Sequence, residues 1–146
     1  MDYEISDDTS RLDIDAIHRW ISEDSYWALG RSRETMERAI SNSLCVGAFA
    51  PDGGQAAFAR VITDRATYAY LCDVYVEPAH RGGGLGKWLI ECVVAHPDLQ
   101  GLRRFCLMTR DAHDLYSRHG FKPMPDPTRF LERHSPDVYR ATEATR

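Results

Sequence analysis

A basic, glycine-rich turn between two apolar segments is the part of the chain best suited to chemistry. An apolar run ends at Pro78, and residues 81–87 then read Arg-Gly-Gly-Gly-Leu-Gly-Lys. From Leu85 onward, apolar residues recur with the spacing of an amphipathic helix. Glycine lets an anion approach the main chain closely, and the first N–H groups of a helix favour negative charge. The pattern predicts a phosphate receptor, to which Arg81 and Lys87 add positive charge.

Two common phosphate-binding loops do not fit this turn. A Walker A loop needs glycine at position 81 and a hydroxyl at position 88, where the chain has Arg81 and Trp88. A G-x-G-x-x-G dinucleotide loop would need glycine at the position of Lys87. The spacing that does fit is R-x-x-G-x-G, formed by Arg81, Gly84 and Gly86.

A second motif follows downstream, where an apolar run leads into Ala112-x-x-x-Tyr116-x-x-x-Gly120-Phe121. Together the two motifs resemble the signatures of the GNAT superfamily of acyl-CoA-dependent N-acetyltransferases. They lie in that family's order, about one helix and one strand apart, and cover residues 71–121. The resemblance implies acetyl-CoA as co-substrate, with no metal, and transfer of its acetyl group to an amine by direct attack on the thioester.

The elements that must position these motifs follow from periodicity and turn signals. Strands are expected at residues 3–6, 44–50, 55–63, 67–76 and 104–109, and helices at residues 13–22, 32–42, 85–95 and 112–119. Ser32 is the expected N-cap of the second helix, and Phe130 and Leu131 suggest a last strand. This order predicts a single α/β domain over residues 1–146, with a mixed sheet, helices on both faces and a parallel β-α-β unit. The resemblance adds a mostly antiparallel sheet whose parallel strand pair splays apart.

The resemblance also assigns cofactor-binding residues. The pantetheine arm would lie between residues 73–76 and 106–109, and Val74 and Val76 would offer it main-chain groups. The diphosphate would rest on the amides of the glycine turn, namely Gly82, Gly83, Gly84, Leu85, Gly86 and Lys87. Thr109 occupies a place where many relatives carry asparagine, and the resemblance implies a side-chain contact to pantetheine there.

Two residues are candidates for proton transfer. Tyr116 matches the family tyrosine that reaches the CoA sulfur, which makes it the expected general acid; the alternative is a tyrosine that only packs. Asp73 could accept the proton of the amine, directly or through water. Because side chains alternate along a strand, Asp73 could equally be a polar residue on the solvent side.

Acceptor recognition must come from outside both motifs. Tyr26 and Trp27 could form an aromatic wall, or be ordinary core or interface residues. Three arginines (Arg31, Arg33 and Arg60) could hold a carboxylate of the acceptor, and a solvated surface explains them equally well. The acceptor itself stays open between a small molecule and a protein amine.

Bulk composition excludes several classes. With 43% apolar and 27% charged residues, neither disorder nor membrane embedding is favoured, and no apolar run approaches the ~20 residues of a membrane helix. Four cysteines without a C-x-x-C pair (Cys45, Cys72, Cys92 and Cys106) and an acidic start without a secretory pattern favour reduced thiols in a cytoplasmic protein. A net charge of −4 argues against a nucleic-acid partner. A homodimer is possible by analogy.

Other functions remain open at this point. A CoA-binding regulatory domain without turnover would keep the glycine turn, and an O-acetyltransferase would differ only in its acceptor. In a purely structural domain the turn would bind nothing.

Overall fold

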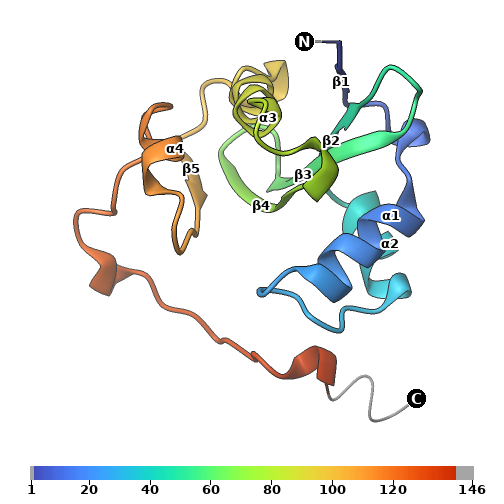
Figure 1. The fold of residues 1–146 in the computed structure, drawn as a ribbon. Helices are drawn as coiled ribbons and strands as arrows, with labels where there is room; N and C mark the ends of the chain where they lie inside the picture. Colours follow the sequence, from blue (N-terminus) through green and yellow to red (C-terminus); the bar gives the residue numbers. More distant parts are fainter. Residues whose placement is uncertain (1, 141–146) are drawn as a thin grey trace.

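The computed structural model describes residues 2–140 and contains a five-stranded sheet in the order β1-β2-β3-β4-β5 (Figure 1). The strands are β1 (Glu4–Ser6), β2 (Leu44–Phe49), β3 (Gln55–Thr63), β4 (Tyr68–Val76) and β5 (Arg104–Leu107). The first four strands pair antiparallel, and β4 and β5 pair in parallel. The expected mixed α/β sheet with one parallel pair is confirmed.

Helices cover both faces of the sheet (Figure 1). They are α1 (Ile14–Arg19), α2 (Arg33–Ser41), α3 (Leu85–Val94) and α4 (His113–Ser117). One core joins α1 and α2 to Phe58 and Tyr75 of the sheet, and the other joins Leu89 and Ile90 of α3 to the opposite face. The first helix is longer than expected because α1 continues as a π-helical segment, Trp20–Asp24, whereas α4 is shorter. Ser32 is confirmed as N-cap of α2, because its hydroxyl accepts the N–H of Thr35.

Strand β4 contains a β-bulge at Asp73. Cys72 pairs with Arg60 and Tyr75 pairs with Phe58, so two residues of β4 oppose one residue of β3 between these pairs. Asp73 has a φ of 49°, a left-handed conformation that non-glycine residues seldom adopt. Bulges of this kind bend a strand and redirect its side chains.

The bulge exchanges the two faces of the strand. Before it, Ala69 and Leu71 lie in the core under α3; after it, Val74 and Val76 pack against that same core. The odd-numbered positions therefore face α3 in the first half of β4, and the even-numbered positions do so in the second half. Asp73 itself points to the α1 and α2 side, where its partners lie.

The two parallel strands separate after the pair formed by Leu71 and Leu107. They pair from Tyr68 with Arg104 to Leu71 with Leu107, where β5 ends while β4 runs on to Val76. The expectation that residues 106–109 face an open edge is therefore wrong for Cys106 and Leu107, which still belong to the ladder. The unpaired edge of β4 on this side begins after Leu71.

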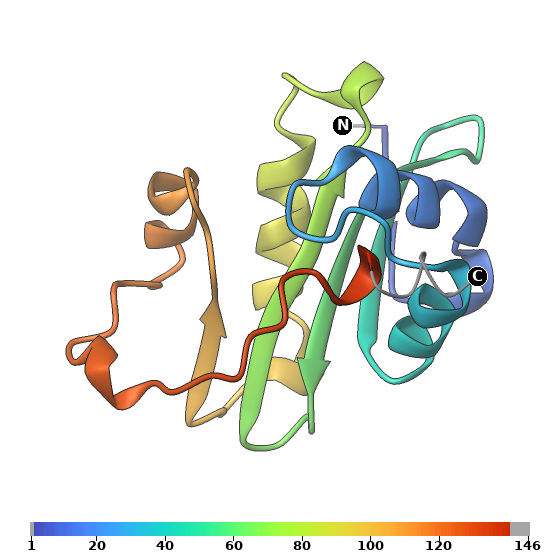
Figure 2. The same ribbon diagram turned by 90° about the horizontal axis from the view of Figure 1, so that it is seen from below.

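The expected strand at Phe130 and Leu131 is absent from the described residues. Pro123, Pro125 and Pro127 precede it, and proline cannot donate a ladder hydrogen bond. Instead, the tail runs across the α1 and α2 side of the sheet and ends beside these helices (Figure 2). Tyr139 packs against the core formed by α1 and α2, so the tail is fastened at its far end.

Candidate functional site

The glycine turn (residues 81–87) presents main-chain N–H groups without protein acceptors. Gly82 and Gly84 adopt φ values of 90° and 87°, and Gly84 is the N-cap of α3 with no side chain to cap the helix. Trp88 is the first residue of the helix to donate, to the carbonyl of Gly84 at 3.0 Å. Within residues 2–140, the amides from Gly82 to Lys87 therefore bond to no protein oxygen, as an anion site requires.

The start of α3 lies directly against the end of β4. A Cβ on Gly86 would lie 3.4 Å from a methyl group of Val76, which is van der Waals contact. The glycine turn and the unpaired edge of β4 are thus adjacent.

Arg81 is attached to the end of β4. Its Nε donates to the Val76 carbonyl at 2.7 Å, and its guanidinium lies 5.1 Å from the centroid of the Tyr75 ring. Of the main-chain groups of Val76 that sequence analysis offered to pantetheine, the carbonyl is therefore already bonded. Val74 remains on the unpaired stretch of β4.

Tyr116 is half-buried on α4, with its ring edge-on to Phe121 at 6.1 Å between centroids. Its hydroxyl makes no hydrogen bond with the described part of the chain. Burial, with a smaller contribution from nearby Tyr26, raises the pKa of Tyr116 above its usual value. The phenol therefore keeps its proton at neutral pH, which a general acid needs.

Thr109 lies just beyond β5, and its hydroxyl accepts the N–H of Ala112 at 3.0 Å. This bond stabilises the chain at the start of α4. The side chain predicted to touch pantetheine is thus engaged by the protein.

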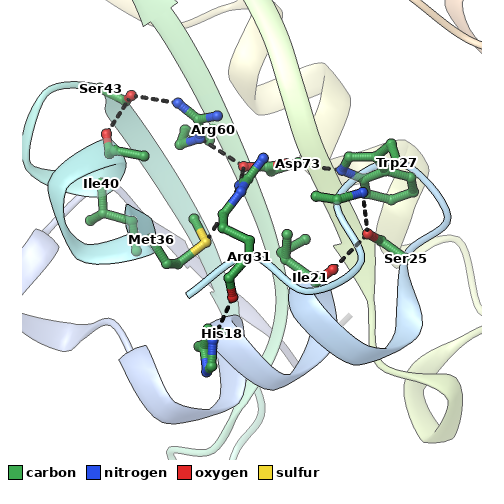
Figure 3. Close-up of polar contacts among 12 residues, drawn as sticks. His18, Ile21, Ser25, Trp27, Arg31, Met36, Ile40, Ser43, Arg60 and Asp73 are labelled. Carbon is green, nitrogen blue, oxygen red and sulfur yellow. Dashed lines mark hydrogen bonds and ion pairs between the residues drawn. The ribbon is translucent and has the colours of Figure 1, made fainter. Parts of the chain in front are cut away.

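Asp73 lies at the centre of a buried polar cluster (Figure 3). Its Oδ2 accepts hydrogen bonds from Nη1 of Arg31 at 2.6 Å and from Nε of Arg60 at 2.8 Å. Its Oδ1 accepts the indole N–H of Trp27 at 2.9 Å. We call these four residues the Asp73 cluster.

The environment of Asp73 bears on both interpretations of this residue, as a proton acceptor and as a polar residue on the solvent side. Asp73 is only 3% exposed, so the expectation of a solvent-facing residue is wrong. Burial alone would raise the pKa of Asp73, but Arg60 and Arg31 outweigh it and lower the pKa below its usual value. A carboxylate with both oxygens bonded and a lowered pKa is a poor proton acceptor, so the geometry favours an anchoring task over that of a base.

The arginines proposed for an acceptor carboxylate are satisfied by the protein. Arg31 and Arg60 are buried against Asp73, and Arg31 also donates to the hydroxyl of Tyr139 at 3.0 Å. Arg33 pairs with Asp15 and Glu37 on the surface. Each of the three arginines is therefore paired with a carboxylate of the protein itself.

The segment between α1 and α2, here called the aromatic loop (residues 25–32), bridges the two parallel strands. Trp27 reaches β4 through Asp73, and its ring is edge-on to Tyr26 at 5.1 Å between centroids. On the other side of Tyr26, Cζ of Arg110 lies 3.8 Å from the ring centroid. Arg110 follows β5 and was not singled out in the sequence, since nothing in its motif reveals the partner on the distant loop.

Comparison with known proteins fits this geometry. The family described as acetyltransferase (GNAT) domain matches residues 42–123. A Gibberella zeae protein, FG08082, named provisionally as an acetyltransferase, is 32% identical over 139 residues, which is 81% of this chain and 77% of the relative.

This chain belongs to the GNAT family of acetyltransferases.

Solved structures agree with the assignment to the GNAT family. A GNAT-family protein of Xanthomonas campestris, also named provisionally as an acetyltransferase, is 54% identical with a TM-score of 0.91, over 94% of this chain and 96% of that one. N-acetylglutamate synthase from Neisseria gonorrhoeae, in complex with coenzyme A and N-acetyl-glutamate, shares the fold, with 22% identity and a TM-score of 0.69. That match covers 98% of this chain and 32% of the synthase.

Two other features of this GNAT domain concern its surface and thiols. A shallow hollow of about 370 Å³ adjoins the glycine turn and is lined by Gly84, Lys87, Trp88 and Glu91.

All four cysteines are free, and burial is the main cause that raises the pKa of Cys45 and of Cys72 to about 12. Among residues 2–140, no helix has the length and apolar character to cross a bilayer.

Proposed function

We propose that this GNAT-family protein transfers the acetyl group of acetyl-CoA to an amine. The observation that carries the proposal is the row of unbonded amides from Gly82 to Lys87 at the start of α3. The free hydroxyl of Tyr116 supports it further. That a protein of the same fold binds coenzyme A and an N-acetylated product adds weight to the same reading.

The donor's diphosphate binds to the glycine turn, where Lys87 contributes charge and the dipole of α3 favours an anion. Its pantetheine arm follows the unpaired edge of β4 past Val74, where β5 no longer covers the strand. A main-chain N–H on this edge then polarises the thioester carbonyl.

The reaction proceeds by attack of the neutral amine on the thioester carbonyl. A C–N bond forms, the C–S bond breaks, and the amine loses one proton. The departing thiolate resembles cysteine, with a pKa of about 8.5, and takes a proton from Tyr116. Tyr116 then regains a proton from solvent.

The amine proton passes to solvent rather than to Asp73, whose carboxylate is held by Arg31 and Arg60. For a lysine-like acceptor with a pKa of about 10.4, kcat/KM should therefore rise roughly tenfold per pH unit from about pH 6 to 9. The raised pKa of Tyr116 keeps the acid protonated over this range. A plateau that begins near pH 7 for such an acceptor would contradict this, because it would reveal a base on the enzyme. An acceptor of lower pKa is the control, since its plateau should move down with its own pKa.

Thermal unfolding with acetyl-CoA tests the donor site. At about 100 times its Kd the ligand should add about 2.7 kcal/mol to the free energy of unfolding. Gly82→Ala should reduce this stabilisation severalfold or more, because alanine is strained at a φ of 90° and the turn must change shape.

The matched control is Gly101→Ala. Gly101 also has a positive φ, 71°, and at both glycines an added Cβ meets nothing within 4 Å. The control variant should lose similar intrinsic stability yet keep its full response to acetyl-CoA. Absence of any response in the wild-type protein, or an equal loss in both variants, would contradict the proposed site.

A further inference from the structure

Arg110 lies on the face of an exposed aromatic ring. Its Cζ is 3.8 Å from the centroid of the Tyr26 ring, and both residues are exposed. A guanidinium stacked in this way is held in place by the ring, while its N–H donors point outward in the plane of the group. The arrangement presents a fork of donors to solvent.

This fork has no counter-charge within residues 2–140. The ion pairs of the described chain do not include Arg110, and its neighbour Asp111 is not bonded to it. Arg31 and Arg60, by contrast, both bind Asp73. Arg110 is thus a positioned cation whose donors remain available to a ligand.

Arg110 is related to the proposed general acid through Tyr26. Tyr26, on which it stacks, is close enough to Tyr116 to contribute to the raised pKa of that phenol. The glycine turn begins α3, which covers the opposite face of the sheet from α1 and α2, the helices that the aromatic loop connects. The glycine turn and the aromatic loop that holds Arg110 thus belong to different elements of the fold.

Large exposed side chains lie close to Arg110 in the chain or contact it through Tyr26. Tyr26 is 52% exposed, Trp27 is 42% exposed and Met108, two residues before Arg110, is 72% exposed. Large side chains of this kind on a surface mark binding positions when they gather at one place. Here Tyr26 contacts Arg110 on its face and Trp27 at its edge.

We propose that Arg110 binds a carboxylate of the acceptor, so that the substrates are amines that carry one carboxylate on an apolar body. Amino acids with aromatic or large aliphatic side chains have this chemistry. The guanidinium fork fits a carboxylate bidentately, and one arginine next to Asp111 matches a single negative charge better than a phosphate dianion. The aromatic loop covers the apolar body, and Arg110 orients the amine toward the thioester. This inference rests on the proposed acetyl transfer.

The test compares matched acceptors with acetyl-CoA, by release of free thiol. Each set contains an amino acid, its amide and the decarboxylated amine: L-phenylalanine, phenylalaninamide and phenethylamine, then the leucine series. Because the three amines of a set differ in pKa, kcat/KM is expressed per neutral amine. On that basis the wild-type enzyme should favour the carboxylate member of each set by about tenfold or more, the value of a charged hydrogen bond.

Three variants locate the effect. Arg110→Gln should raise KM for the amino acid about tenfold and leave the amide and the amine unchanged, which removes the preference. Arg110→Lys should retain part of the preference because it keeps the charge without the fork. Arg118→Gln, an exposed arginine beyond α4, is the control and should behave like the wild type.

Binding of the same acceptors to the CoA-loaded protein, measured by thermal shift, provides a readout that does not need turnover. A preference that persists in Arg110→Gln, or its absence from the wild type, would overturn the role of Arg110. If acetyl-CoA binds but no carboxylated acceptor is acetylated or stabilises the protein, the inference fails while the donor site stands. If acetyl-CoA itself does not bind, the proposed function fails as well.

Discussion

Replacement of Asp73 by alanine should lower the free energy of unfolding by about 3–5 kcal/mol, because it leaves buried charges without a partner. The side chains of Arg31 and Arg60 are each only 9% exposed, and both bind the same carboxylate oxygen. The variant also removes the acceptor of the Trp27 indole N–H. Urea unfolding at neutral pH measures the difference directly.

Asp15→Ala is the matched control for this experiment. Asp15 also pairs with an arginine, Arg33, but its side chain is 77% exposed. Solvent screens such a pair, so the control should lose less than about 1 kcal/mol. Equal losses for the two variants would show that the Asp73 cluster is not the buried ion network described above.

The pH dependence of the Asp73 effect has a definite sign. The folded protein lowers the pKa of Asp73, so the stabilisation is present in full above the unfolded-state value of about 3.9 and is lost as pH falls through the folded value. The gap in unfolding free energy between the wild type and Asp73→Ala should therefore stay constant above about pH 5 and shrink in stronger acid. A gap that shrinks instead toward alkaline pH would contradict this assignment.

Tyr116→Phe should lower kcat by about 10²–10⁴-fold, the range typical of a lost general acid. The phenylalanine ring keeps the contact with Phe121, and the hydroxyl that is removed makes no hydrogen bond with the described chain. Stabilisation by acetyl-CoA should therefore stay as in the wild type. Steady-state thiol release with saturating acetyl-CoA, together with thermal shift, separates the two quantities.

Tyr68→Phe is the control for the loss of a phenol. Tyr68 lies at the start of β4, where its hydroxyl contacts the Cys106 sulfur at 2.9 Å, and its pKa is raised to about 12 mainly by that contact. This change should leave kcat within about twofold, since the residue lies outside the proposed site. If Tyr116→Phe retained the wild-type kcat, Tyr116 would have no part in the chemistry.

Much of the fold was predictable because its signals are local. Strand β3 covers residues 55–63 as expected from the hairpin turn before it, and Ser32 caps α2 as its residue type indicates. The bulge in β4 was not predictable. Asp73 adopts a left-handed conformation, and the sequence has no glycine at this position that would have indicated one. In the tail, three prolines before Phe130 were a local signal against a strand, and they proved stronger than the two apolar residues.

The site divides in the same way. The glycine turn and Tyr116 belong to short motifs, so their residues could be named from the sequence. The Asp73 cluster joins residues far apart in the chain, since Arg31 and Asp73 are 42 positions apart and Trp27 and Asp73 are 46 positions apart. A sequence shows that these charged residues exist, but only the folded chain shows that they neutralise one another.

Because of the single extra residue in β4, the side chains that face α3 change from odd-numbered to even-numbered positions within one strand. Upstream of Asp73 the odd-numbered side chains lie beneath α3, and downstream the even-numbered ones do. Removal of one residue here would restore a regular strand and turn Val74 and Val76 toward α1 and α2, while Tyr75 would leave its stacking partner Trp20. The bulge thus determines which side chains of each half of β4 pack against α3 and which pack against α1 and α2.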